Sequence, residues 1–167
     1  CENIVARAHH RGDPSFTLSF VFQSLTGRGG ALVNRLDFDL APFMRQLDAA
    51  VRRVDESSFT LSVAFSVLLS SASVLEGFGN NPNVFVAELE KVVAVAATAG
   101  CAITCTALLY AMQQSQPLFP TLINAGVSLE DFARRVVRAC GTLRLAPAQH
   151  ANVLHYCLTN GRVWLAL

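Results

Sequence analysis

Residues 59–75 read FTLSVAFSVLLSSASVL and contain no ionisable side chain. An apolar segment of this length without a charged face is expected to form a helix that other helices surround. The stretch Val92–Met112 (VVAVAATAGCAITCTALLYAM) has the same character. Because alternation of apolar and polar residues is not sustained anywhere in the chain, the sequence predicts an all-α bundle of five to seven helices with a long apolar central helix.

The sequence Ser-Phe-Thr-Leu-Ser (SFTLS) occurs at Ser15–Ser19 and again at Ser58–Ser62. Serine is a preferred N-cap, since its hydroxyl accepts a hydrogen bond from an early backbone N–H of the helix. We therefore expect Ser15 to cap a helix over 16–25, and Ser57 or Ser58 to cap the next apolar helix. The two copies have different sequence surroundings, which indicates two separately capped core helices rather than a duplicated unit.

The segment 40–55 predicts an amphipathic helix with Asp39 as its N-terminal cap. Its charged residues, Asp48 among them, are expected on the faces away from the core. The apolar residues recur at the spacing of one helix face and are Phe43, Leu47, Val51 and Val54. Further helices are expected over 83–112, 128–140 and 146–158.

The 167 residues are 52% hydrophobic and 15% charged, a balance that excludes an intrinsically disordered chain. The net charge of +1 gives no general attraction to nucleic acid, so no nucleic-acid partner is expected. One folded domain is the expectation for this length. It comprises a polar lead-in over 1–14, the helical bundle over 15–140, and a C-terminal short helix and tail over 141–167 packed on the same domain.

Five cysteines are present, an odd number that cannot pair completely within one chain. In a secreted protein they would form one or two disulfide bonds, and in a cytosolic protein they would remain small buried apolar residues. Cys101 and Cys105 lie one helical turn apart, as half of a zinc site would. The short two-residue spacing of closed zinc sites is absent, so buried thiols are the favoured interpretation. The candidates for disulfide formation are Cys101, Cys105, Cys140 and Cys157.

Val92–Met112 is also long enough to cross a bilayer. Its Ala, Thr, Gly and Cys residues contribute little transfer free energy, and its flanks lack Trp and basic clusters. A buried central helix is therefore favoured over a membrane-inserting one, and no stable membrane insertion is expected.

Short motifs that could carry chemistry are weak in this chain. Arg11-Gly12-Asp13 matches the integrin-binding tripeptide, but three residues recur by chance. The glycine-rich segment 27–30 lacks the Lys-Ser/Thr pair of a phosphate-binding loop. No histidine is joined to a serine or cysteine by a recognised catalytic motif. We therefore expect no enzymatic activity, no metal and no cofactor.

Two blocks of the sequence resemble the N-terminal domains of spider-silk proteins (spidroins). Phe22–Asp39 (FQSLTGRGGALVNRLDFD) has the Phe-ended helix, the Gly-Arg-x-Gly turn and the Leu-Asp-rich start of a second helix. Leu61–Glu76 (LSVAFSVLLSSASVLE) has the third-helix pattern of an Ala-Phe core pair, a Ser-rich turn and a closing Glu. The resemblance covers residues 16–78, under half of the chain.

The resemblance implies a secreted, extracellular five-helix bundle without enzymatic activity. Such a domain holds a silk-like structural protein soluble at neutral pH and associates as a homodimer on acidification. The family's second glutamate falls on Ser71 and its basic partner near Ser57, so Arg52 and Arg53 are the candidates for the missing base. The acidic positions that the resemblance assigns to dimer formation and pH sensing are Asp39, Glu76, and either Glu130 or Asp131.

The same carboxylates have a simpler interpretation as caps and solvated charges at helix ends. A different function class is also open, because the chain is similar to apoptosis regulators of the B-cell-lymphoma family, including divergent viral members. Val92–Met112 would be the core helix and Asp48 would lie on an amphipathic helix, although the Asn-Trp-Gly-Arg signature is absent before the core helix. This alternative predicts an intracellular adaptor whose hydrophobic groove binds an amphipathic helical peptide.

Overall fold

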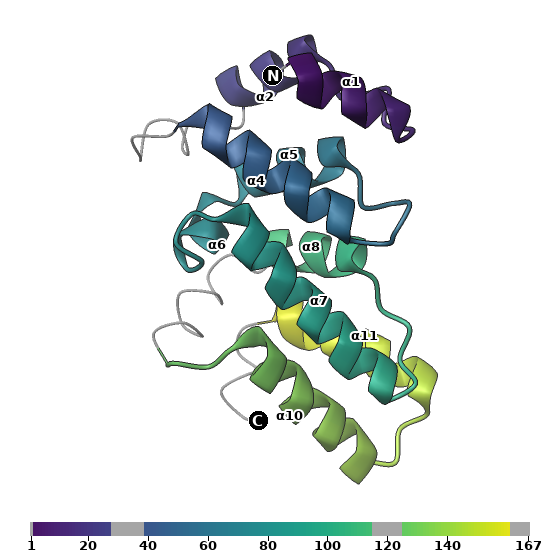
Figure 1. Cartoon of the computed structure of the whole chain (residues 1–167). Helices are drawn as coiled ribbons and strands as arrows, with labels where there is room; N and C mark the ends of the chain where they lie inside the picture. The colour runs from purple at the N-terminus through teal and green to yellow at the C-terminus, as the bar shows by residue number, and fades with distance from the viewer. Residues whose placement is uncertain (1, 28–38, 115–124, 161–167) are drawn as a thin grey trace. The chain divides into compact units, whose positions relative to one another are not determined.

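The structure, a computed structural model, describes residues 2–27, 39–114 and 125–160 (Figure 1). All regular secondary structure in these ranges is α-helical, which confirms the all-α prediction. The helices in the described ranges number nine, more than expected, because two apolar segments expected to be continuous are each divided and the expected lead-in contains α1. In chain order they are α1 (Glu2–His10), α2 (Leu18–Thr26), α4 (Leu40–Arg53), α5 (Leu61–Ser70), α6 (Ala72–Glu76), α7 (Pro82–Thr98), α8 (Cys105–Gln114), α10 (Leu129–Thr142) and α11 (Pro147–Thr159).

The helices belong to two compact units, Cys1–Phe85 and Val86–Leu167. In the first unit α1 packs against α4, and both α4 and α2 pack against α5. In the second unit α11 packs against α8 and α10. Residues 1–14, expected to be a lead-in, thus contain a packed helix of the first unit, and residues 141–167 contain one of the second.

Four phenylalanine rings lie at the centre of the first unit. The fully buried ring of Phe65 in α5 has its centroid 5.8 Å from that of Phe16 and 6.2 Å from that of Phe43. The ring of Phe20 in α2 lies 6.1 Å from Phe65 and 5.9 Å from Phe16. Tilted and edge-on ring pairs at such distances each contribute about 0.5–1.5 kcal/mol beyond the burial of their area. Phe65 therefore links α2 and α4 to α5.

The repeated SFTLS sequence begins two helices in the same way. In the first copy the Thr17 hydroxyl accepts a hydrogen bond from the backbone N of Phe20 at 3.0 Å. In the second copy the Thr60 hydroxyl accepts one from the backbone N of Val63 at 3.3 Å. Both threonines have extended backbone dihedrals, as N-caps do. The third residue of the repeat is thus the cap of α2 and of α5.

The expectation that Ser15 and Ser57 or Ser58 cap these helices is therefore wrong. The helices begin later than expected because the phenylalanine of each copy, Phe16 or Phe59, is buried ahead of the first turn. A buried apolar residue just before the N-cap fixes the angle at which the chain enters a helix.

The expected continuous helix over Val92–Met112 is wrong, because residues 99–104 separate α7 from α8. Gly100 lies in this break with a φ of +71°, a conformation that strains any residue with a Cβ. The backbone N of Cys101 donates to the carbonyl of Ala96 at 3.0 Å, the hydrogen bond of a Schellman C-cap. One glycine thus ends α7 although its neighbours are apolar.

The second unit has a core of aliphatic, aromatic and thiol side chains. Helices α8 and α10 both pack on α11, and all three hold residues that are almost fully buried. They include Leu108, Met112, Phe132, Val136, Leu154 and Leu158. This packing also encloses Cys140 and Cys157.

Candidate functional site

A buried carboxylate joins the two copies of SFTLS within the first unit. Asp13 lies in the turn after α1, where Gly12 has a φ of +83° that lets the chain reverse. Asp13 is 5% exposed, and its Oδ2 accepts a hydrogen bond from the backbone N of Ser62 at 2.8 Å. Its Oδ1 accepts hydrogen bonds from the Ser62 hydroxyl and, at 2.7 Å, from the Ser15 hydroxyl. The carboxylate thus satisfies an N–H in the first turn of α5 from outside that helix.

The surroundings of Asp13 favour its ionised form. Burial by itself would favour the neutral acid, but the hydrogen bonds from Ser62 and Ser15 outweigh it and lower the pKa of Asp13 below its ordinary value. The positive end of the α5 dipole acts in the same direction. Because this carboxylate is buried and bound, Arg11-Gly12-Asp13 does not present its acid to an integrin in this fold.

Asp48 of α4 is a second buried acid in the first unit. It is 2% exposed, so its expected place on a polar face is wrong. Its Oδ2 lies 2.9 Å from Nη2 of Arg7 and 3.4 Å from Nη2 of Arg52. Arg7 belongs to α1, so this ion pair joins α1 to α4. A buried carboxylate of this kind needs such partners, because an unpaired buried charge is strongly destabilising.

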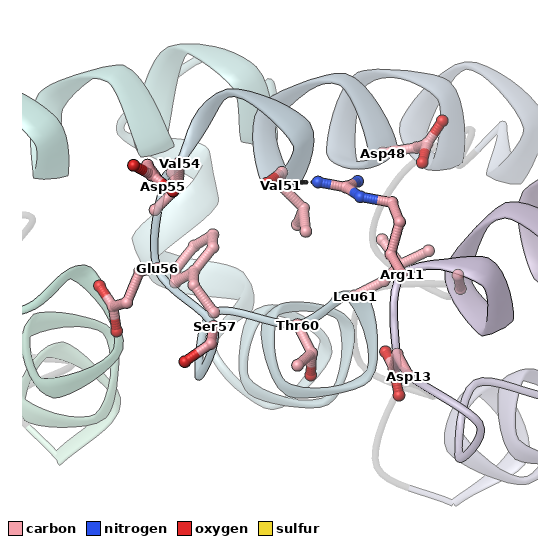
Figure 2. A pocket seen from close by; sticks show the side chains of 12 residues that line it. Arg11, Asp13, Asp48, Val51, Val54, Asp55, Glu56, Ser57, Thr60 and Leu61 are labelled. Atoms are coloured by element: carbon pink, nitrogen blue, oxygen red, sulfur yellow. Dashed lines mark hydrogen bonds between the residues drawn. The ribbon is translucent and has the colours of Figure 1, made fainter.

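A cavity of about 260 Å³ lies in the first unit, lined by α1, α4 and the loop before α5 (Figure 2). The side chain of Arg11 extends along it, and its Nη2 donates to the carbonyl of Val51 at 3.3 Å. Sites for drug-sized ligands have volumes of roughly 300–1,000 Å³. This cavity therefore has room for a small ligand or a single side chain.

The carboxylates around the cavity are mostly occupied. Asp13 and Asp48 are bound as described, and Oε1 of Glu56 accepts a hydrogen bond from the Ser58 hydroxyl at 2.6 Å. Asp55 is exposed and, within the described parts of the chain, has no hydrogen bond or ion pair. The described lining holds no histidine or cysteine. The cavity is thus a polar pocket whose buried acids serve the fold.

The acid and the bases that the silk resemblance assigns to α4 lie at opposite ends of that helix. Asp39 caps its N-terminus by accepting a hydrogen bond from the backbone N of Ala41 at 3.0 Å. Arg52 and Arg53 lie in the last turn, about 20 Å away at 1.5 Å per residue. Arg52 is paired with Asp48, and Arg53 donates to Oδ1 of Asn83 at 2.6 Å. The structure does not bring these predicted residues together.

The remaining predicted acids are also at helix ends. Glu76 is the exposed last residue of α6 in the first unit. In the second unit Oε1 of Glu130 lies 2.5 Å from Nη2 of Arg134. The backbone N of Asp131 donates to the Ser128 hydroxyl, which in turn donates to the Asp131 carboxylate, each at 3.0 Å. Glu130 and Asp131 thus have local roles in the first turn of α10, in agreement with the capping interpretation.

The four candidate cysteines are buried free thiols in this structure. Burial raises the pKa of Cys101, Cys140 and Cys157, and the proximity of Cys140 raises it further at the other two positions. Cys105 at the start of α8 is buried as well. Buried thiols of this kind react slowly, because the thiolate is the reactive form. A disulfide among them stays a prediction.

In the described residues, no group of three or more His, Cys, Asp or Glu side chains could hold a metal ion. Among the helices of the described ranges, none combines the length and the apolar character needed to cross a membrane.

Sequence reasoning missed both buried acids, although a local signal exists for each. An acidic residue stands two positions before each serine that begins SFTLS, and in both copies this serine donates to it. Asp48 and Arg52 are four residues apart, the spacing of an ion pair along a helix. No local signal could have identified Ser62 as a partner of Asp13, because 49 residues separate them.

Comparison with protein-family models, with curated proteins and with solved structures found no match for this chain.

Proposed function

We propose that this protein is a non-enzymatic assembly domain of a secreted, silk-like structural protein. It holds the chain soluble at neutral pH and associates as a homodimer on acidification. The proposal is supported by the sequence blocks Phe22–Asp39 and Leu61–Glu76, which resemble spidroin N-terminal domains. The all-α fold is compatible with it.

The observation that carries the proposal is the exposed apolar face of α2. This helix has no charged residue, and Val21 is its one buried side chain. Leu18 is 48% exposed and Phe22 is 69% exposed, one turn apart on the same side. Exposed large apolar side chains that lie together are typical of contact surfaces. Two copies of an uncharged helix can approach each other without like-charge repulsion, which suits a homodimer.

The carboxylates are the groups through which acidification would favour association. By linkage, lower pH favours association when the dimer binds more protons than two monomers do. Because Arg52 and Arg53 are already engaged within the first unit, the acid-driven step is loss of repulsion between carboxylates rather than formation of new ion pairs. The carboxylates that the silk resemblance assigns to this step are Asp39, Glu76, and either Glu130 or Asp131.

Sedimentation velocity tests the proposal, with reducing agent present and the pH lowered from about 7 to about 5.5. The expected result is a monomer that becomes a dimer. Phe22→Ser should keep the protein monomeric at the lower pH, whereas Val84→Ser, at a 46% exposed apolar position on α7, should not. A single mass at every pH would contradict the assembly function. A dimer that Phe22→Ser leaves intact would exclude α2 as its contact surface.

The apoptosis-regulator alternative requires a groove that accepts several side chains of an amphipathic helix. The cavity beside Arg11 has a volume of about 260 Å³, which suits a small ligand or a single side chain. This cavity therefore gives the alternative no support.

A further inference from the structure

Among the described residues that line the cavity of the first unit, Arg11 is the one with a basic side chain. This side chain extends along the cavity, and its Nη2 donates to the carbonyl of Val51 at 3.3 Å (Figure 2). Within the described parts of the chain, Arg11 makes no other side-chain hydrogen bond and no ion pair. A guanidinium has five N–H donors, so the other four of Arg11 have no partner there.

The acids that line the same cavity do not neutralise Arg11. The buried Asp13 accepts its hydrogen bonds from serines, and Asp48 is paired with arginines of α1 and α4. Figure 2 shows the carboxylates of Asp55 and Glu56 across the cavity from the guanidinium of Arg11 and turned away from it. The guanidinium therefore lies at the cavity without a carboxylate of the described residues to bind.

Buried apolar side chains form much of the remaining wall of the cavity. Phe59 and Leu61 line it and are each 3% exposed, and Ala8 and Val51 are buried beside them. Arg11 is exposed, so a molecule from the solvent can reach the guanidinium and place an apolar body against this wall. An apolar lining with a few polar groups that fix the orientation of a ligand is typical of small-molecule sites.

We propose that this cavity binds a small organic carboxylate with a short apolar body. The planar fork of Arg11 matches the two oxygens of a carboxylate, and such charge-assisted hydrogen bonds are about twice as strong as neutral ones. The apolar body contacts Phe59 and Val51. One guanidinium balances one negative charge, so a carboxylate suits the site better than a phosphate dianion, and an amine would be repelled by Arg11. The site is independent of the proposed homodimer, whose contact helix is α2.

NMR titration of the isotope-labelled protein tests the site with probes of one shape and different charge: isovalerate, its neutral amide isovaleramide, and isopentylamine. Isovalerate should shift the backbone amides of residues 51–61 and saturate with a Kd of about 1 mM, since so small a ligand makes few contacts. The neutral amide should bind at least about tenfold more weakly, because it loses the charge-assisted hydrogen bonds. Acetate lacks the apolar body and should also bind about tenfold more weakly. Isopentylamine should not bind.

Three variants test the role of Arg11 itself. Arg11→Gln should weaken isovalerate binding about tenfold or more, and Arg11→Lys, which keeps the charge but not the fork, should weaken it less. Arg45→Gln removes an exposed arginine of α4 that does not line the cavity and should leave binding unchanged. Thermal melts of the variants check that they are folded.

Several results would overturn the proposal. They are the absence of amide shifts with isovalerate at about twenty times the expected Kd, equal binding of the amine or of acetate, and unchanged binding in Arg11→Gln. Asp55→Asn gives a further check, because it removes a negative charge from the lining. This variant should strengthen isovalerate binding about twofold, and a weaker binding would show that the cavity prefers a cation.

Discussion

The two copies of SFTLS show that one local sequence can lie in two different structural environments. In both copies the first serine donates to an acid two residues earlier, Ser15 to Asp13 at 2.7 Å and Ser58 to Glu56 at 2.6 Å. In both copies the phenylalanine is buried and the threonine caps the helix that follows. The short-range hydrogen bonds therefore repeat with the sequence.

The copies differ in what lies around them. Asp13 is buried and reaches the last serine of the other copy, Ser62, whereas Glu56 is half-exposed at the cavity. Ser62 is buried, but its counterpart Ser19 is exposed on α2. The motif itself therefore determines the helix cap. The packing of α2 on α5 determines that Asp13, the acid beside the first copy, is buried against the start of α5.

The largest loss of stability is expected at the phenylalanines. Phe16→Ala should lower the free energy of unfolding by about 3–5 kcal/mol, because Phe16 contacts the rings of Phe20 and Phe65. Phe59→Ala should cost less, since Phe59 lines the cavity and, within the described residues, has no ring contact to lose. Urea unfolding, with hydrogen exchange of the α2 and α5 amides, measures both. A larger loss for Phe59→Ala would contradict this ranking.

The acids beside the two copies should differ in how much they contribute to the free energy of unfolding. Asp13→Ala leaves the hydroxyl and backbone N–H of the buried Ser62 without their acceptor, and should cost about 2–4 kcal/mol in unfolding free energy. Glu56→Ala is the matched control at a half-exposed site, with an expected change within about 0.5 kcal/mol. Denaturant unfolding of the two variants provides the test. Similar losses would mean that Asp13 does not clamp the turn to α5.

The stability of the protein in acid should depend on Asp13, the buried acid beside the first copy. Because the folded state lowers the pKa of Asp13, its stabilisation is complete above the pKa of an unfolded aspartate, about 3.9. That stabilisation is lost as the pH falls through the folded value. Below about pH 4, the wild type should therefore lose stability more steeply than Asp13→Asn. Parallel curves for the wild type and Asp13→Asn in acid unfolding would exclude this linkage.

The smallest effects on stability, and the most similar between the two copies, are expected at the N-cap threonines. Thr17→Ala and Thr60→Ala each remove one hydrogen bond to a helix N-terminus and should each cost about 1 kcal/mol. Ser19→Ala changes an exposed residue and should stay within about 0.5 kcal/mol. Thermal melts of the three variants are sufficient. A cost near zero at either threonine would show that the two copies are not capped alike.

Much of the fold could be predicted from the sequence, because helices depend on local properties. The apolar residues Phe43, Leu47 and Val51 are buried along α4, as their spacing indicates. The errors are local too. Gly100 ends α7 inside an apolar run, but the apolar residues around it favoured the prediction of a continuous helix. The caps were placed at serines, although threonine is a cap of similar strength.

Little of the candidate site could be predicted, because its contacts join distant parts of the chain. The pair Asp13–Ser62 spans 49 residues and Arg7–Asp48 spans 41. An exposed acid and a buried, paired acid look the same in a sequence, since burial depends on which helices pack over the position. The predicted acids Asp39, Glu130 and Asp131 were the ones with local capping signals.

By itself the sequence determined that this chain is helical and that a helix follows each SFTLS motif, because hydrogen bonds within a few residues specify these features. Only the tertiary structure decided that Asp13 is a buried clamp while Glu56 stays half-exposed at the cavity. It also decided that Asp48 lies inside the first unit and that Arg11 lies at the cavity without an ion pair among the described residues. The physical reason is that desolvation and long-range pairing depend on neighbours in space, which a local pattern does not specify.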